Sequence, residues 1–145
     1  MERIAADAAS NLVATDLLSL RFDERTKSRG KALTDRGIEI EWFLDRGLFL
    51  RNGDVLQSDQ GQLVAIVAAP EKVSLVTSSQ QHLLLRAAYH LGNRHIPLQV
   101  EPQSLRFQPD HVLDEMVVSL GLELHHVDQA FQPEDGAYHG GHKHD

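Results

Sequence analysis

Three histidines near the C-terminus are the clearest chemistry-bearing residues of this chain. Residues 139–145 read HGGHKHD and contain His139, His142 and His144. Imidazole suits nickel, zinc, copper or cobalt, and glycine lets a chain bend around an ion. A tag remnant and a plain solvated tail are the alternatives, although tags usually carry an unbroken histidine run. The spacing indicates a labile metal clamp rather than a rigid catalytic site.

His111 is a second candidate ligand because of its place on a predicted helix. Asp110 can cap that helix, Gly121 can end it, and its apolar stripe consists of Val112, Leu113, Met116, Val117 and Leu120. At about 100° per residue, His111 and Val118 lie nearly opposite the stripe. The helix N-terminus disfavours imidazolium, so His111 should stay neutral, as a metal ligand must. Geometry alone leaves two readings open: a partner surface, or a solvated surface histidine.

The other histidines have less specific positions. His125 and His126 are neighbours in a predicted strand, so their side chains point to opposite faces, and we interpret both as ordinary strand residues. His82 and His90 fall on another predicted helix, where a structural role is favoured. His95 lies in a connecting loop, and its spacing decides nothing.

Composition excludes several classes of protein. The chain has 145 residues, a net charge of -7 and no cysteine. Without cysteine, disulfides, thiolate nucleophiles and sulfur-rich zinc sites are impossible. The acidic balance argues against a nucleic-acid binder, and no apolar stretch approaches the roughly 20 residues that span a bilayer. We expect a cytoplasmic protein that binds neither nucleic acid nor membrane.

Hydrophobic periodicity predicts an α+β protein of two domains. Apolar and polar residues alternate in several short segments of residues 1–70, which indicates a small antiparallel β sandwich or barrel. Residues 71–133 follow the order βαββαβ of a ferredoxin-like unit, with Ser78 and Gln81 as a capping box for the first helix. Residues 134–145 are polar and rich in glycine and histidine, and we expect them to form a flexible tail.

A basic cluster lies in the first half of the chain. It consists of Arg21, Arg25, Lys27, Arg29 and Lys31. Clustered basic side chains can bind an acidic partner, although a solvated loop explains the pattern equally simply.

Several longer stretches resemble the UreE family of urease accessory proteins, which are nickel metallochaperones. The family-like stretches in the second half are AAYHLGNRHIPLQ (87–99), DHVLDEMVVSLGL (110–122) and FQPEDGAY (131–138). In the first half they are RFDERTKSRGKAL (21–33) and FLDRGLFLRNGDVL (43–56). The resemblance therefore runs through nearly the whole chain in the expected order, and GNRH followed by DHVL is its most specific part.

The resemblance implies a non-catalytic nickel carrier. It implies an N-terminal β domain likened to peptide-binding modules and a ferredoxin-like domain that binds metal and forms a homodimer. His111 is then the central Ni(II) ligand, supplied by both protomers, and His142 and His144 complete the coordination, with His139 less firmly implied. Zn(II) and Cu(II) are alternative ions in vitro. The implied partners are the urease GTPase UreG and the urease apoprotein with its accessory complex. Whether dimers pair into a tetramer around one ion stays open.

The chain departs from some members of the family in two places. Long polyhistidine tails are replaced by three histidines, which favours transfer of an ion over storage. Histidines that precede DHVL in some members are replaced by Phe107, Gln108 and Pro109, which offer no extra ligand. His95 belongs to the GNRH motif, and we favour a role in shaping the loop.

Two rival functions come from other classes. A metal-dependent hydrolase could use His111 and Glu115, which share one helix face. Hydrolysis would need a rigid set of ligands and a positioned base, and the sequence contains no such motif. A general buffer for zinc or copper without a dedicated partner is the other rival.

Overall fold

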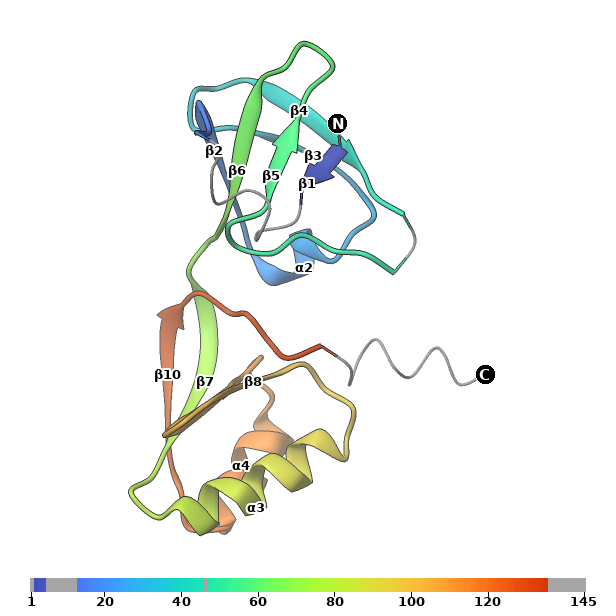
Figure 1. The fold of residues 1–145 in the computed structure, drawn as a ribbon. Coiled ribbons are helices and arrows are strands. Elements are labelled where there is room, and N and C mark those ends of the chain that lie inside the picture. The colour runs from blue at the N-terminus through green and yellow to red at the C-terminus, as the bar shows by residue number, and fades with distance from the viewer. Residues whose placement is uncertain (1, 5–12, 46, 136–145) are drawn as a thin grey trace. The chain divides into compact units, whose positions relative to one another are not determined.

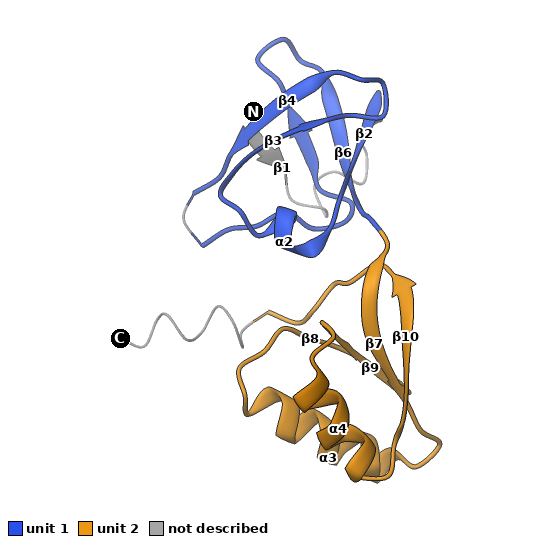
Figure 2. Cartoon of the chain, turned by 180° about the vertical axis from the view of Figure 1, so that it is seen from behind, with its two compact units in different colours: residues 1–69 blue, residues 70–145 orange. Residues whose placement is uncertain are grey.

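The computed structural model describes residues 2–4, 13–45 and 47–135. The chain divides into two compact units, residues 1–69 and residues 70–145, which Figure 2 shows in different colours. Strands dominate the first unit, and the second combines a sheet with helices (Figure 1). The α+β fold class expected from the sequence is confirmed. No helix in the described ranges is long and apolar enough to cross a membrane.

Unit 1 contains two small sheets. One has the strand order β1-β5-β6-β2, and the other pairs β3 with β4. The strands are β1 (Glu2–Ile4), β2 (Asp16–Leu20), β3 (Arg29–Leu33), β4 (Glu39–Phe43), β5 (Val55–Gln57) and β6 (Leu63–Ala68), and the short helix α2 (Phe22–Arg25) follows β2. Alternate residues of β2 and β4 are buried in one hydrophobic cluster, as period-two patterning predicts.

One feature of unit 1 differs from the expected antiparallel arrangement. β2 pairs with β6 in parallel, from Asp16 opposite Val64 to Leu20 opposite Ala68, whereas the other strand pairs of this unit are antiparallel. Alternation identifies the buried face of a strand but is the same in both strand directions. The long connection between β2 and β6, which contains α2 and β3 to β5, allows the parallel pairing.

Trp42 and Gly30 make the tightest contact in the core of unit 1. Trp42 is almost fully buried, and its indole N–H donates to the carbonyl of Lys27. The indole lies against Gly30, its cross-strand partner in β3, so closely that a Cβ atom there would overlap the ring. Only glycine leaves space for this side chain.

Asp16 attaches β2 to the turn between β3 and β4. Its carboxylate accepts hydrogen bonds from the backbone N–H groups of Leu17 and Arg36. Burial raises the pKa of Asp16, but hydrogen bonds from the Thr34 side chain and these two N–H groups, with the charge of Arg36, outweigh it and hold the pKa below its ordinary value.

Unit 2 has the expected ferredoxin-like order. Its elements are β7 (Glu71–Thr77), α3 (Gln81–Gly92), β8 (Leu98–Glu101), β9 (Ser104–Phe107), α4 (His111–Ser119) and β10 (Glu123–Gln129). The strands form an antiparallel sheet in the order β10-β7-β9-β8, and both helices lie on one face of it (Figure 1). Apolar residues of both helices and the sheet form one core.

The start of α3 differs from the expected capping box. Gln80 is the N-cap and has no side-chain capping bond, so the helix begins at Gln81 rather than just after Ser78. The hydroxyl of Ser78 accepts from the N–H of Gln80 in the preceding turn, and the side-chain amide of Gln81 donates to the carbonyl of Pro102. Both polar groups therefore have other partners than a capping box provides.

Replacement of Gly30 tests the packing of Trp42. The Gly30→Ala variant should lose about 1–3 kcal/mol of unfolding free energy in unit 1, because its methyl group must displace the indole. Trp42 is the only tryptophan of the chain, so its fluorescence during urea unfolding reports on this unit. Gly92→Ala, where nothing lies within 4 Å of the added Cβ, should leave the Trp42 transition in place. Equal stability of the Gly30→Ala and parent proteins would contradict the packing argument.

The depressed pKa of Asp16 predicts an acid-sensitive unit 1. A carboxyl whose pKa is lower in the folded than in the unfolded state stabilises the fold above its unfolded pKa, and this contribution disappears as the pH falls through the folded pKa. The unfolding free energy reported by Trp42 should therefore drop between about pH 5 and pH 3, and Asp16→Asn should make that dependence shallower. The exposed Asp59, replaced in the same way, should keep the parent's dependence.

Candidate metal centre

His111 is the first residue of α4, and its position depends on the cap before it. The Asp110 carboxylate accepts hydrogen bonds from the N–H groups of Val112 (2.9 Å) and Leu113 (3.2 Å), which confirms the expected N-cap. This bond pair satisfies two of the free N–H groups of the first turn and places a negative charge at the positive end of the helix. The backbone at His111 is thereby held in helical geometry.

The imidazole of His111 lies on the outer side of α4. Leu113 and Val117 are buried in the core of unit 2, whereas His111, Glu115 and Val118 are exposed. This is the orientation that the spacing predicts for a residue opposite the apolar stripe. His111 is therefore available to a ligand or partner outside its own fold.

Val112 was expected in the buried stripe, and that expectation is wrong. Its side chain is 51% exposed. Val112 lies roughly 120° around the helix from the midpoint of Leu113 and Val117, so it falls beside the buried stripe. Val118, which is 55% exposed, is a second exposed valine on the same helix as His111.

The described residues do not gather a complete metal site in one chain. No group of three or more histidine, aspartate or glutamate residues that could hold an ion occurs among them. His139, His142 and His144, the expected tail ligands, lie outside the described residues. Of the four expected ligands, only His111 therefore has a described position.

The chain just before the tail is attached to the sheet. Phe131 is fully buried, the N–H of Gln132 donates to the Gln99 side chain (2.8 Å), and the N–H of Glu134 donates to the Leu98 carbonyl (2.8 Å). The segment following β10 thus runs along β8 (Figure 1), and we call residues 130–135 the strap. Glu134, which lies in the segment expected to form the flexible tail, therefore bonds to β8 through its backbone N–H.

His126 has a partner that sequence reasoning missed. Its Nε2 atom lies 2.8 Å from Oδ2 of Asp114, and the hydroxyl of Ser74 donates to Oδ1 of the same carboxylate (2.8 Å). The serine bonds to the aspartate and not to the histidine, so this group does not activate a nucleophile as a catalytic triad does. No local motif could reveal it, because the three residues belong to β7, α4 and β10.

The remaining described histidines lie in other elements than His111. His82 and His125 are exposed, and His90 packs edge-on against Tyr89 in α3. His95 is exposed and has a φ of 57°, a left-handed conformation that no other described residue except glycine adopts. This backbone geometry favours the interpretation that His95 shapes the loop after α3.

The basic cluster of unit 1 does not form one charged face. Arg25 is only 1% exposed, and its Nε donates to the Leu20 carbonyl. Arg21 pairs with Glu24 and Lys31 pairs with Glu39. Spacing along the chain suggested a common patch, but the turn at α2 directs Arg25 inward.

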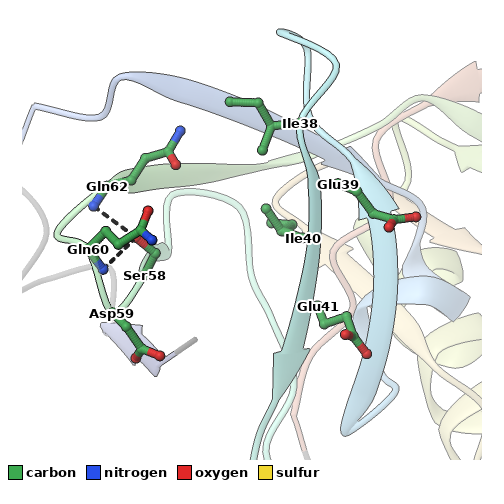
Figure 3. A pocket seen from close by; sticks show the side chains of 8 residues that line it. All are labelled: Ile38, Glu39, Ile40, Glu41, Ser58, Asp59, Gln60 and Gln62. Carbon is green, nitrogen blue, oxygen red and sulfur yellow. Dashed lines mark hydrogen bonds between the residues drawn. The ribbon is translucent and has the colours of Figure 1, made fainter.

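A cavity of about 320 Å³ lies beside β4 in unit 1. Figure 3 shows Ile38 and Ile40 directed toward Gln60 and Gln62 across it, with Glu39 and Glu41 on the other side of the strand. The hydroxyl of Ser58 accepts from the N–H groups of both glutamines and so holds the opposite wall. The lining combines isoleucine, serine and glutamine side chains with the carboxylates of Glu39, Glu41 and Asp59, and no group of three or more ligand residues that could hold a metal ion is found among the described residues.

Comparison with known proteins covers both units. Residues 1–69 match the family described as "UreE urease accessory protein, N-terminal domain", and residues 71–145 match its C-terminal domain. A urease accessory protein of Saccharophagus degradans is 50% identical over 139 residues, which cover 96% of this chain and 83% of the relative. A relative from Teredinibacter turnerae is 50% identical over 135 residues (93% and 88%), and one from Pseudomonas putida is 50% identical over 127 residues (87% and 76%).

Substitution of His95 distinguishes a loop-shaping residue from a ligand. His95→Gly should keep or raise stability, since glycine adopts positive φ freely, whereas the β-branched His95→Val should cost about 1–2 kcal/mol. Thermal unfolding followed by circular dichroism of the helices measures both effects. Nickel binding should be unchanged in His95→Gly, and its loss in a well-folded variant would identify His95 as a ligand instead.

Proposed function

Because the chain belongs to the UreE family of urease accessory proteins, we propose that it carries Ni(II) to urease on a site built around His111 of two copies. As a member of this family it is an accessory protein of urease maturation and not an enzyme. The observation that carries the proposed site is the direction of His111, which starts α4 on the side away from its own core.

A two-fold axis explains why one outward imidazole per chain is useful. In an isologous interface each residue meets its own symmetry mate or the neighbours of that mate, so one residue per protomer can supply two ligands. The described part of a single chain contains no group of three or more histidine, aspartate or glutamate side chains that could hold an ion. We therefore propose a homodimer in which His111 and the same residue of a second copy bind one ion.

Two exposed valines on the same helix as His111 support this choice of partner. Val112 and Val118 are more than half exposed on α4. Complete burial of a valine side chain contributes about 1.5 kcal/mol, so two copies of this pair would favour association. A second copy presents the same surface, as an isologous contact requires.

His139, His142 and His144 are proposed as additional donors. The strap ends at Asp135, the last residue that the structure describes. At roughly 3.5 Å per extended residue, His139 can lie up to about 14 Å and His144 up to about 31 Å from Asp135. Donors on such a segment can join or leave the ion without repacking the domain, which suits capture followed by release.

The two units have separate roles in this proposal. Residues 71–133 bind metal and dimerise, residues 134–145 add tail donors, and residues 1–70 bind a protein partner. The cavity beside β4 offers unit 1 a surface of isoleucine, glutamine, serine and acidic side chains for an extended segment of such a partner. The partners proposed are the urease GTPase UreG and the urease apoprotein with its accessory complex.

Imidazole ligands do not by themselves select nickel. Copper binds more tightly than nickel to most nitrogen sites, and zinc competes as well. Selection in this proposal comes from the geometry of the shared site and from docking to the nickel-handling partners. A general copper or zinc buffer is the competing function, and it would require no partner.

Nickel titration of the metal-free protein tests the site. The His111→Ala variant should lose the tightest class of ions, one per dimer, or bind it more than about tenfold more weakly, since changes even to groups that only support ligands cost 10–100-fold. Deletion of residues 139–145 should weaken binding without loss of folded structure, because the strap stays intact. Calorimetry gives affinity and stoichiometry, and light scattering gives the number of chains.

His125→Ala is the matched control, since it removes an exposed imidazole from the same unit. Its isotherm should equal that of the parent protein. A parent-like isotherm for His111→Ala would refute the proposed site, and tight zinc or copper binding without transfer of nickel to the urease apoprotein would favour the buffer.

A further inference from the structure

A hydrogen-bonded group attaches α4 to the sheet, and nothing in the proposed function uses it. It consists of Ser74 in β7, Asp114 in α4 and His126 in β10. Asp114 accepts from the Ser74 hydroxyl through Oδ1 and bonds the His126 ring through Oδ2, both at 2.8 Å. We call these three residues the α4 brace.

The brace holds one carboxylate from two sides. Ser74 and His126 are direct cross-strand partners, so their side chains leave neighbouring strands on the same face of the sheet. That face carries the helices, since Val76 and Leu124, two positions away along each strand, pack into the core beneath them. The side chain of Asp114 is only 16% exposed, so its charge depends on these partners in place of water.

The brace constrains the orientation of α4, which the other contacts of this helix do not. Leu113 and Val117 anchor the helix by apolar burial, which is not directional. The Asp110 cap bonds only to N–H groups of the same helix and does not connect it to the sheet. The Asp114 carboxylate accepts one hydrogen bond from each of two strands. Together these bonds fix both the rotation of α4 about its axis and its position along the sheet.

The position of Asp114 connects the brace to the candidate ligand. Residues three apart in a helix are neighbours on its surface, about 60° apart around the axis, and Asp114 is three residues after His111. A rotation of α4 would therefore carry His111 away from the place that a symmetric site requires. Small displacements matter there, because a ligand pair across a two-fold axis doubles any error in one chain.

We propose that the α4 brace positions His111 for metal binding, and that His126 acts through Asp114 rather than as a ligand. This inference rests on the proposed function, because it assumes that His111 is the shared ligand. His126 is 49% exposed, so its replacement removes a hydrogen bond and little packing.

The test compares two replacements of His126 with the neighbouring histidine. His126→Ala removes the donor to Asp114, His126→Gln keeps an N–H donor on a side chain of similar reach, and His125→Ala removes an imidazole from the opposite face of β10. Metal-free full-length protein is titrated with nickel chloride. His126→Ala should bind the tightest ion roughly tenfold more weakly, whereas His126→Gln and His125→Ala should bind like the parent.

The rescue by glutamine separates positioning from ligation, since an amide can donate to Asp114 but is a poor nickel ligand. Equal weakening in His126→Ala and His126→Gln overturns the proposal, as does parent-like binding by His126→Ala. Thermal unfolding in parallel shows whether any loss of affinity follows from unfolding, and Asp114→Asn provides a second variant in which the brace is broken from the helix side.

Two further measurements separate failure of the brace from failure of the nickel site. Imidazole signals of His111 in metal-free protein, recorded by NMR, should shift in His126→Ala and not in His125→Ala. Unshifted signals overturn the brace whatever the metal data show.

In the His111→Ala background, His126→Ala should have no added effect on nickel binding, because the brace acts through that residue. If His111→Ala alone leaves the isotherm unchanged while the NMR signals shift, the proposed metal site fails, although the brace still orients α4.

Discussion

The first turn of α4 is the constraint on which the proposed chemistry depends. Asp110 satisfies the N–H groups of Val112 and Leu113, and Leu113 and Val117 then bury the inner side of the helix. With its N-cap and its buried side determined, this short helix carries His111 on its outer side.

A site made of outward side chains is necessarily incomplete in one chain. Rigid metal sites surround the ion with ligands from one fold, and unit 2 uses its interior for an apolar core in which the described residues place no such cluster. In the proposed site, an interface between copies would supply symmetry-related ligands, and His139, His142 and His144 would supply donors that can leave. Both features weaken retention of the ion, and weak retention is an advantage for a protein that must release its cargo to a better site.

The strap and the brace perform complementary tasks in this arrangement. The strap brings the end of the described chain to β8 through Gln99 and Leu98, so the point from which the tail begins is set by the sheet. The brace sets α4 against the same sheet through Asp114. The helix that carries His111 and the start of the histidine-containing tail are thus both attached to the same sheet. This is possible because β10, β7 and β8 all belong to the sheet of order β10-β7-β9-β8.

Local patterns predicted much of this protein because they depend on neighbouring residues. The period-two segments, the helical stripes and the Asp110 cap are set by interactions within a few residues, and the outward direction of His111 follows from them. The family resemblance also depended on short stretches such as GNRH and DHVL. Patterning was less informative at the edges of elements, where Val112 falls outside the stripe and Gln80 replaces the expected cap.

Tertiary structure decided what depends on residues distant in sequence. The parallel pairing of β2 with β6, the burial of Arg25 and the space that Gly30 leaves for Trp42 each require the path of the whole unit. The brace joins positions 74, 114 and 126, and only the strand register brings Ser74 and His126 together under α4. Sequence alone therefore predicted which residues could carry the chemistry and determined which way the helix faces. The fold determined how that helix is held, because hydrogen bonds between distant segments exist only once the sheet has formed.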